Sequence, residues 1–336
     1  MKRTLKKGEF SMGITDSRWI SVAPKVFQDK GTTHLNEELI HRLQFPKGKI
    51  DVVLDTDTFN EVDDQYALAY LIRSSEKLTV KGIYAAPFHN PKAKDAKDGM
   101  EKSYNEILNI LTLMGEETLK AKVYRGSCAF LQDENTPEPS QAVDALLALS
   151  TAYSKENPLY VVAIGAITNI ASALLMDPTL KERIVLVWLG GNALEYPHNC
   201  EFNLTQDIAA ARVCFASSVA MVMLPCRGVV SAFRTSGPEL EHHLRGKNKL
   251  CDYLVDVTAK EAIAWGGNSC WTRTIWDVTT IGWLLNEDFM CSRFETAPIP
   301  EYDHHWARSA NRHLVRYVYE IDRDLLFEDL FQKLIK

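Results

Sequence analysis

The sequence predicts a single-domain α/β protein with a mostly parallel open sheet that is flanked by helices. Two observations indicate this fold class. From Ile50 onward, short apolar runs rich in β-branched residues alternate with longer amphipathic stretches, and such alternation is typical of a parallel sheet covered on both faces. The 336 residues are 46% hydrophobic and 24% charged, which are ordinary proportions for a globular chain with a substantial core.

The first part of the chain differs in character from the rest. Residues 1–35 are polar and weakly patterned, so we interpret them as an N-terminal arm and residues 36–336 as the α/β domain. A short helix is expected over residues 36–43, with Asn36 as its N-cap, because a proline and a glycine follow soon after as termination signals.

The domain's expected elements alternate along the chain. Buried strands are expected at residues 50–54, 78–85, 159–164, 184–188, 219–224 and 314–321. Helices are expected at residues 64–75, 105–115, 140–155, 169–176, 207–217 and 324–334. The polar, lysine-rich stretch 87–100 is long for a connection, and long loops beside a sheet often serve as lids.

Composition and charge exclude several classes of protein. The net charge of −6 argues against general nucleic-acid binding, which depends on clustered Lys and Arg. The basic first residues precede no apolar stretch, so they do not resemble a secretory signal, and no run of about 18 apolar residues predicts a membrane span. The seven cysteines show no Cys-x-x-Cys spacing, which favours reduced thiols over disulfides or a zinc site. We therefore expect a soluble cytoplasmic protein.

Residues 55–64 form an acidic cluster, with four aspartates and one glutamate between the first expected strand and the next helix. Like charges repel, and burial disfavours the ionised form. A hard divalent cation relieves both costs, because it binds several carboxylate oxygens at once. Since open α/β sheets place their chemistry at the carboxyl ends of strands, the cluster predicts a metal-containing enzyme site.

Two other interpretations of the acidic cluster are weaker. The aspartates could cap the following helix, but a cap needs one carboxylate rather than four. The cluster could also be the calcium loop of a helix-loop-helix protein. That loop needs a glycine at its turn position, which is absent here, and the preceding run is strand-like.

The acidic cluster also has a recognisable order: Asp-x-Asp at a strand end, then Asp-Asp before a helix. This order resembles the opening motif of the inosine-uridine-preferring nucleoside hydrolase superfamily, Asp-x-Asp-Pro-Gly-x-Asp-Asp, although the loop here is two residues longer and lacks Pro-Gly. Three later segments, in the family's order, are similar to its Gly-Pro-Leu-Thr-Asn, Gly-Gly with Glu-Phe-Asn, and His-Asp motifs: residues 165–169, 190–203 and 276–277. The sequence is therefore identified as a divergent member, and the resemblance implies the family's Rossmann-like nucleoside hydrolase fold.

The resemblance also implies a role for each matching residue. Ca²⁺ would be bound by Asp57, Asp64, Asp277 and the backbone oxygen of Thr168. Asp57 would in addition act as the general base, and Asp55 would support the cluster from behind. The ribose hydroxyls would be bound by Asp63, Glu201 and Asn203.

The group that would protonate the leaving base is where the sequence departs from the family. Many members have His immediately before the last Asp, where Trp276 stands here, and an indole only donates hydrogen bonds. Trp276 is expected either to stack on the base or to fill the core. The stretch after the second expected strand supplies the last two predicted site residues. His89 is expected to act as the general acid or to contact the 5′-hydroxyl, and Asn90 is expected to contact the 5′ end of the sugar.

The implied activity is calcium-dependent hydrolysis of the N-glycosidic bond of a ribonucleoside, or a related N-riboside, to ribose and free base. It implies a small-molecule nucleoside as partner, a role in purine or pyrimidine salvage, and a homo-oligomer (dimer or tetramer). A haloacid dehalogenase-type phosphohydrolase is one alternative, because it also opens with a strand and Asp-x-Asp. However, Phe59 stands where that class has Thr or Val, and Asp277 would have no role in it. The other alternative is a non-catalytic nucleoside- or ribose-binding homologue.

Overall fold

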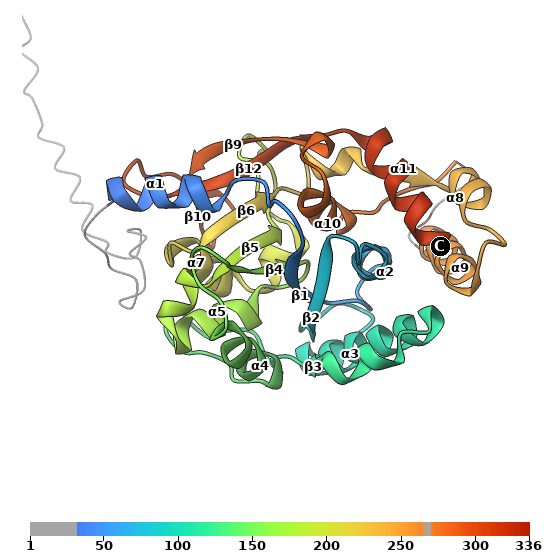
Figure 1. The fold of residues 1–336 in the computed structure, drawn as a ribbon, viewed down its shortest axis with the longest axis horizontal. Coiled ribbons are helices and arrows are strands. Elements are labelled where there is room, and N and C mark those ends of the chain that lie inside the picture. Colours follow the sequence, from blue (N-terminus) through green and yellow to red (C-terminus); the bar gives the residue numbers. More distant parts are fainter. Residues whose placement is uncertain (1–31, 265, 267–269) are drawn as a thin grey trace, which may run out of the picture.

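A computed structural model describes residues 32–264, 266 and 270–336 of the chain. Within these residues the dominant feature is an eight-stranded sheet of order β3-β2-β1-β4-β5-β6-β12-β9 (Figure 1). Its strands are β1 (Ile50–Thr56), β2 (Leu78–Ala85), β3 (Val123–Arg125), β4 (Leu159–Ala163), β5 (Ile184–Leu189), β6 (Ala220–Leu224), β9 (Met290–Thr296) and β12 (Leu314–Ile321). All neighbouring strands pair in parallel except β9, which is antiparallel to β12. Two small antiparallel pairs join β7 (Arg234–Ser236) to β8 (Thr272–Thr274) and β10 (Ile299–Pro300) to β11 (Trp306–Ala307).

Helices cover both faces of the sheet (Figure 1). One face packs against α2 (Asp63–Arg73), α3 (Ala96–Met114), α10 (Val278–Leu285) and α11 (Arg323–Leu334), and the other against α4 (Gln141–Ser150), α5 (Thr168–Met176) and α7 (Ile208–Ala216). The remaining helices are α1 (Thr32–Arg42), α6 (Phe202–Gln206), α8 (Gly237–His243) and α9 (Lys249–Ala264). Short 3₁₀ turns lie at Glu117–Lys122, Pro178–Glu182, Val230–Ala232 and Glu287–Phe289.

The central strand β1 shows why the sheet is buried on both faces. Val52 and Leu54 belong to the apolar core under α2, whereas Val53 belongs to the core under α5. This is the period-2 alternation of a strand, with apolar residues on both faces because helices cover both.

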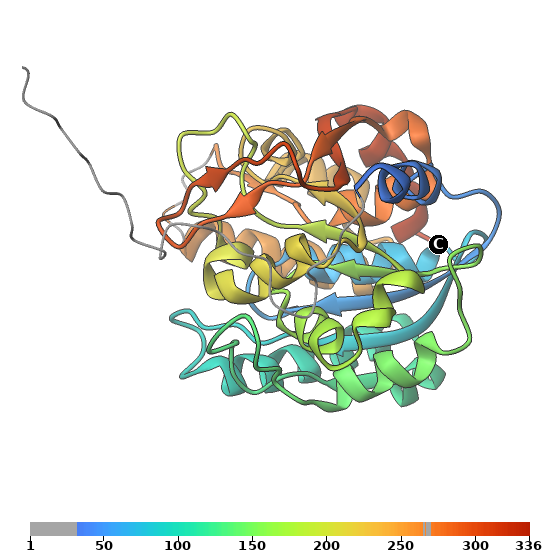
Figure 2. The same ribbon diagram turned by 90° about the vertical axis from the view of Figure 1, so that its left-hand side faces the viewer.

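The order of the strands creates a crevice beside β1. The chain moves outward from β1 to β2 and β3, then returns to β4 on the other side of β1. The parallel strands point in the same direction (Figure 2), so their carboxyl ends form one edge. Ligands of open α/β sheets bind outside this edge, where the strand order reverses.

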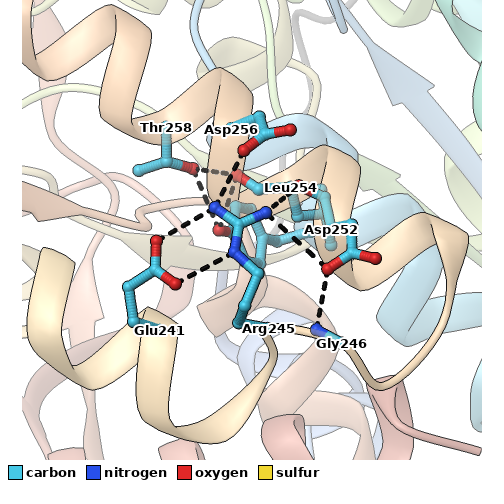
Figure 3. A network of polar contacts seen from close by, with 8 residues as sticks. Glu241, Arg245, Gly246, Asp252, Leu254, Asp256 and Thr258 are labelled. Atoms are coloured by element: carbon cyan, nitrogen blue, oxygen red, sulfur yellow. Dashed lines mark hydrogen bonds and ion pairs between the residues drawn. The ribbon is translucent and has the colours of Figure 1, made fainter.

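Helices α8 and α9 are joined by an exposed ion network around Arg245 (Figure 3). Its guanidinium contacts Glu241 on α8 at 2.9 Å and Asp256 on α9 at 2.8 Å. Helix α9 is also tied to α2, because the Tyr66 hydroxyl lies 2.9 Å from Thr258 Oγ1. This holds the C-terminal end of α9 near the edge that carries the crevice.

The predicted fold class is confirmed, and the strands expected at 78–85 and 314–321 have the expected bounds. Several helix bounds differ. Helix α1 starts at Thr32, so Asn36 is not its N-cap; the Asn36 side chain instead accepts a hydrogen bond from Leu314 N at 3.0 Å. The helix expected at 140–155 ends at Ser150.

The stretch 87–100 is not entirely a loop. Helix α3 begins at Ala96, nine residues before the expected start at residue 105, because Asp95 accepts a hydrogen bond from Asp98 N and caps it. Elements β3, β9, α8 and α9 were not predicted. The predicted arm and its boundary with the domain stay a prediction, since residues 1–31 lie outside the described residues. None of the helices in the described part of the chain has the length and apolar character needed to cross a membrane.

Candidate active site

A small pocket lies at the carboxyl ends of the central strands. Its buried floor is formed by Asp57, Asn60, Asp63, Asp64, Ile164, Leu189, Glu201, Asn203, Cys226 and Asp277. Its mouth is formed by the exposed and half-buried lining residues Glu61, Cys200, Phe202, Arg227 and Trp276. The whole cavity of about 140 Å³ is smaller than the about 300–1,000 Å³ of typical drug-sized ligand sites, so it suits a group the size of a sugar.

Two helix N-termini supply three carboxylates of the floor. Asp63 and Asp64 are the first residues of α2, and Asp277 directly precedes α10. Their carboxylate oxygens lie within 4.8 Å of one another. The positive end of a helix dipole favours carboxylates at such positions, and the Thr56 hydroxyl donates a hydrogen bond to Asp64.

Asp57 is the least satisfied group of the floor. Both of its carboxylate oxygens are buried, and within the described residues neither accepts a hydrogen bond. Gly165 follows β4 and packs directly against it: a Cβ there would lie 3.1 Å from Asp57 Cγ. A larger residue at 165 would therefore displace Asp57.

Burial and mutual repulsion raise the pKa values of these carboxyls. Desolvation raises the pKa of Asp64 to about 6. It raises the pKa of Asp57, Asp63 and Asp277 well above the ordinary range, and the neighbouring carboxylates raise these pKa values further. A buried set of oxygen donors that repel one another is the arrangement a hard divalent cation stabilises.

Asp55 lies behind the floor and does not line the pocket. It is fully buried, and its Oδ1 accepts a hydrogen bond of 2.7 Å from Asn169 Nδ2. The other end of the Asn169 amide accepts hydrogen bonds from the backbone and hydroxyl of Ser127 at 2.8 and 2.9 Å. Desolvation raises the pKa of Asp55 to about 7.

Glu201 is held rigidly by backbone donors. It caps α6: its Oε1 accepts from Asn203 N at 2.9 Å, and its Oε2 accepts from Gly191 N and Leu204 N at 2.8 and 2.9 Å. Desolvation still raises its pKa, although these three N–H groups lower it. The Gly-Gly and Glu-Phe-Asn segments are thus joined through one carboxylate.

Asn203 has a fixed orientation in the floor. Its Nδ2 donates to the carbonyl oxygens of Ile164 and Leu189 at 3.2 and 3.0 Å, where β4 and β5 end. Because both donors are used, the remaining polar atom of the side chain is the acceptor Oδ1.

Four of the predicted site residues do not line the pocket, Asp55 among them. Thr168 is the buried first residue of α5, and its hydroxyl donates to Asp207 at 2.7 Å. His89 is exposed, and Asn90 Nδ2 donates to Asn60 Oδ1 at 2.7 Å. Asn90 therefore contacts a residue of the pocket, Asn60, without lining the pocket itself.

The acidic loop between β1 and α2 is tied to two other segments by ion pairs. Lys92 Nζ contacts the Asn60 carbonyl oxygen and Glu261 Oε2, both at 2.7 Å. Arg273 Nη2 contacts Glu61 Oε2 at 2.7 Å and Glu261 Oε1 at 3.4 Å. The loop, the 87–95 connection, α9 and β8 thus meet at one side of the mouth.

Several pocket residues were not predicted: Asn60, Cys200, Phe202, Cys226 and Arg227. Phe202 is the middle residue of the predicted Glu-Phe-Asn motif and Cys200 directly precedes that motif, so their position in the sequence was a usable signal. Cys226 and Arg227 follow β6 at the same edge as the other site residues, so the strand-end rule applied to them as well.

Comparisons with known proteins agree on one family. A family model described as inosine-uridine preferring nucleoside hydrolase matches residues 52–328. The pyrimidine-specific ribonucleoside hydrolase RihB of Shigella flexneri serotype 5b is 29% identical over 170 residues, which are 47% of this chain and 49% of that protein. The chain thus spans about half the length of the curated relatives it matches.

Solved structures show the same fold at low identity. A plant nucleoside hydrolase superposes with a TM-score of 0.68 at 19% identity, covering 85% of this chain and 99% of the other. The purine-preferring ribonucleoside hydrolase from Gardnerella vaginalis superposes with a TM-score of 0.65 at 19% identity, covering 85% and 98%.

Proposed function

The chain belongs to the inosine-uridine preferring nucleoside hydrolase family, and on that premise we propose that it hydrolyses the N-glycosidic bond of a ribonucleoside or a related N-riboside. The observation that carries the proposal is the floor of the pocket, where carboxylates from residues 57–64, 201 and 277 converge on a cavity of sugar size. In this reaction a water oxygen bonds to C1′ of the ribose and the C1′–N bond breaks. The base leaves with the bonding electrons and takes up a proton.

Asp57 is the proposed general base. One of its carboxylate oxygens accepts the proton of the attacking water. Both oxygens are available for this, because neither accepts a hydrogen bond from the described residues. Burial and the neighbouring carboxylates raise the pKa of Asp57, and a higher pKa makes a carboxylate a stronger base toward the proton of a water.

The ribose is proposed to bind to Asp63, Glu201 and Asn203. Asn203 offers a single acceptor, Oδ1, because its amide nitrogen is already used. Glu201 is immobilised by three N–H groups, so a sugar hydroxyl that bonds to it loses little additional side-chain freedom. Both residues orient the sugar with C1′ toward Asp57.

A calcium ion is proposed to be held by Asp57, Asp64, Asp277 and the backbone oxygen of Thr168. The aspartates fit such an ion, because Asp64 and Asp277 belong to a buried carboxylate cluster and both oxygens of Asp57 are buried without a hydrogen-bond partner among the described residues. The contribution of Thr168, which does not line the pocket, rests on the family resemblance. When bound, the ion supplies Lewis-acid activation of the attacking water. Asp63 belongs to the same cluster, and we propose that it binds a ribose hydroxyl beside the ion.

His89, which was predicted to protonate the leaving base, is exposed and does not line the pocket. Trp276 at the mouth is proposed to stack on the base, because a half-buried indole beside a small sugar-sized floor offers an aromatic face.

The setting of the enzyme is also a proposal. Six cysteines, at positions 128, 200, 214, 226, 251 and 291, form no disulfide among the described residues, which is consistent with a reducing, cytoplasmic compartment. We propose a role in nucleoside salvage and assembly as a dimer or tetramer, which light scattering of the purified protein would test.

The proposed activity is tested with a panel of nucleosides and phosphate esters, each with calcium and with a chelator. Reducing sugar and inorganic phosphate are both measured. Ribose released in calcium and not in the chelator supports the proposal. Phosphate release alone would favour the phosphohydrolase, and tight nucleoside binding without turnover would favour the non-catalytic homologue.

A further inference from the structure

We propose that Arg227 forms an anion-binding subsite at the mouth of the pocket, and that the preferred substrate carries a carboxylate or phosphate group. The proposal rests on the proposed nucleoside-hydrolase function and narrows its substrate class. Arg227 is exposed and lines the same pocket as the carboxylate floor. Within the described residues its guanidinium forms no ion pair and no hydrogen bond.

The backbone at Arg227 is firmly held, so the side chain starts from a fixed point. Arg227 N donates to Asn192 Oδ1 at 3.1 Å, and its carbonyl accepts from Ala193 N at 2.8 Å. Gly228, the next residue, has a φ of +92°, and a Cβ on it would lie 2.6 Å from the Cβ of Ala193. The turn after β6 therefore requires glycine at 228, and it holds the backbone of Arg227 in a fixed position.

The other cations beside the pocket are already neutralised. Lys92 is paired with Glu261, and Arg273 with Glu61 and Glu261. Arg227 therefore differs from both, because its guanidinium forms no ion pair with any of the described residues. A guanidinium presents a planar set of donors that matches carboxylate and phosphate oxygens in a bidentate manner.

The size of the cavity explains why the anion belongs to the part of the substrate outside the floor. The cavity of about 140 Å³ is enclosed by floor and mouth residues together and is smaller than the about 300–1,000 Å³ of typical drug-sized ligand sites. Once the ribose occupies the floor, the rest of a nucleoside therefore extends past the mouth residues. There Arg227 is accompanied by the aromatic rings of Phe202 and Trp276. The anionic group is either a carboxylate on the base or a phosphate on the 5′ carbon, and both present the same oxygen chemistry.

Three substrates distinguish these sources: uridine, uridine 5′-monophosphate, and orotidine, which is uridine with a carboxylate on the base. We expect the wild type to prefer one of the two anions over uridine in kcat/KM. Arg227→Gln should lower the ratio of anion to uridine by about 10- to 100-fold, the loss expected for a charge-assisted contact. Arg227→Lys should restore part of it. Arg234→Gln, an exposed arginine outside the pocket, should leave the ratio unchanged.

A binding measurement separates failure of the subsite from failure of the proposed function. Calorimetry with calcium and either orotate or ribose 5-phosphate should show binding to the wild type that weakens in Arg227→Gln. If uridine is hydrolysed at least as well as both anions, or the ratio is unaffected by Arg227→Gln, the subsite is wrong and the activity stands. If no substrate is hydrolysed but an anion binds through Arg227, the activity is wrong and the subsite stands.

Discussion

Asp57 combines two features that a purely structural residue would not tolerate. It is buried among like charges, and neither carboxylate oxygen has a donor among the described residues. The sequence alone predicted that Asp57 lies at the end of the first strand. Its burial among other carboxylates explains why a water and a cation are suitable partners for its oxygens.

Replacing Asp57 should therefore separate activity from stability. Asp57→Asn should lower kcat by about 10²- to 10⁴-fold, because a general base contributes that much. Without calcium the variant should unfold at a higher temperature than the wild type, because one buried charge is removed. Asp51→Asn is the matched control: it lies on the same strand, outside the pocket, and contacts Lys81 and Tyr153. Near-normal turnover of Asp57→Asn with calcium bound would show that the role is misassigned.

Trp276 can be tested for its two expected roles at once, because it lines the mouth and also packs against the core. If it stacks on the base, Trp276→Ala should lower kcat/KM by about 2- to 10-fold, the equivalent of an aromatic contact, and Trp276→Phe should retain most of it. If it only fills the core, Trp276→Ala should lower the melting temperature and leave base preference unchanged. Trp271→Ala, a half-buried indole outside the pocket, controls for the general loss of an aromatic ring.

At the scale of elements, the acidic loop depends on segments far away in the sequence. Arg273 on β8 contacts Glu61 of the loop and Glu261 of α9. Both glutamates have limited access to water, with 29% and 8% of their side chains exposed. Removing the cation would leave Glu61 without this ion pair, whereas Glu261 would keep its ion pair with Lys92.

Arg273→Met should therefore destabilise the protein by about 1–3 kcal/mol and raise KM more than it lowers kcat, because Glu61 lies at the mouth rather than on the floor. Arg245→Met is a contrasting control, since its network between α8 and α9 is exposed (Figure 3) and such pairs contribute little. Urea unfolding and steady-state kinetics of the two variants provide the comparison. Equal destabilisation by both changes would contradict the proposed anchoring of the loop.

Apolar runs predict the strands of the sheet well, whether one or both of their faces are buried. Strands β2 and β12 have the expected bounds, and the fully buried strands β4, β5 and β6 each differ from the expected range by one residue. Helix α9 was not predicted because its buried face includes Cys251 and Thr258. The burial of these residues depends on contacts with distant parts of the chain, such as the contact between Thr258 and Tyr66 on α2.

The same distinction separates the floor of the site from its mouth. The floor follows strand ends and helix starts, so local sequence order predicts it: Asp57 follows β1, and Asp63 and Asp64 are the first two residues of α2. The mouth depends on how long loops fold over the edge. Arg227 lies at the mouth because the turn after β6 is hydrogen-bonded to Asn192 and Ala193. No short-range sequence pattern predicts those contacts.

At the scale of the whole molecule, a large apolar core supports a site that opposes folding when its carboxylates ionise. The pKa of Asp64 is raised to about 6 and that of Asp55 to about 7, from an ordinary value of 3.8. A carboxyl whose pKa is raised by folding favours the folded state below its unfolded pKa, and this contribution is lost as the pH rises through the folded pKa. Without a cation, these groups should therefore destabilise the protein progressively between about pH 4 and pH 7.

Buried His313 acts in the opposite direction. Desolvation lowers its pKa from 6.5 to about 3, so its contribution to stability is present above pH 6.5 and is lost as the pH falls below it. A simple pH profile of stability would mix the two effects. The difference between profiles with and without calcium removes the contribution of His313, because this residue contacts Ser218 and lies outside the pocket.

The gap in melting temperature between calcium-loaded and chelator-treated protein should accordingly be small at pH 5 and widen by several degrees at pH 8. Protons compete with the cation for the same carboxylates at low pH, whereas at high pH the cation compensates charges that otherwise repel. Thermal unfolding by circular dichroism measures both profiles without relying on turnover. Asp277→Asn should remove most of the gap at pH 8, and Asp51→Asn should preserve it. A gap that does not change with pH, or no calcium effect at pH 8, would show that the buried aspartates do not form the cation site.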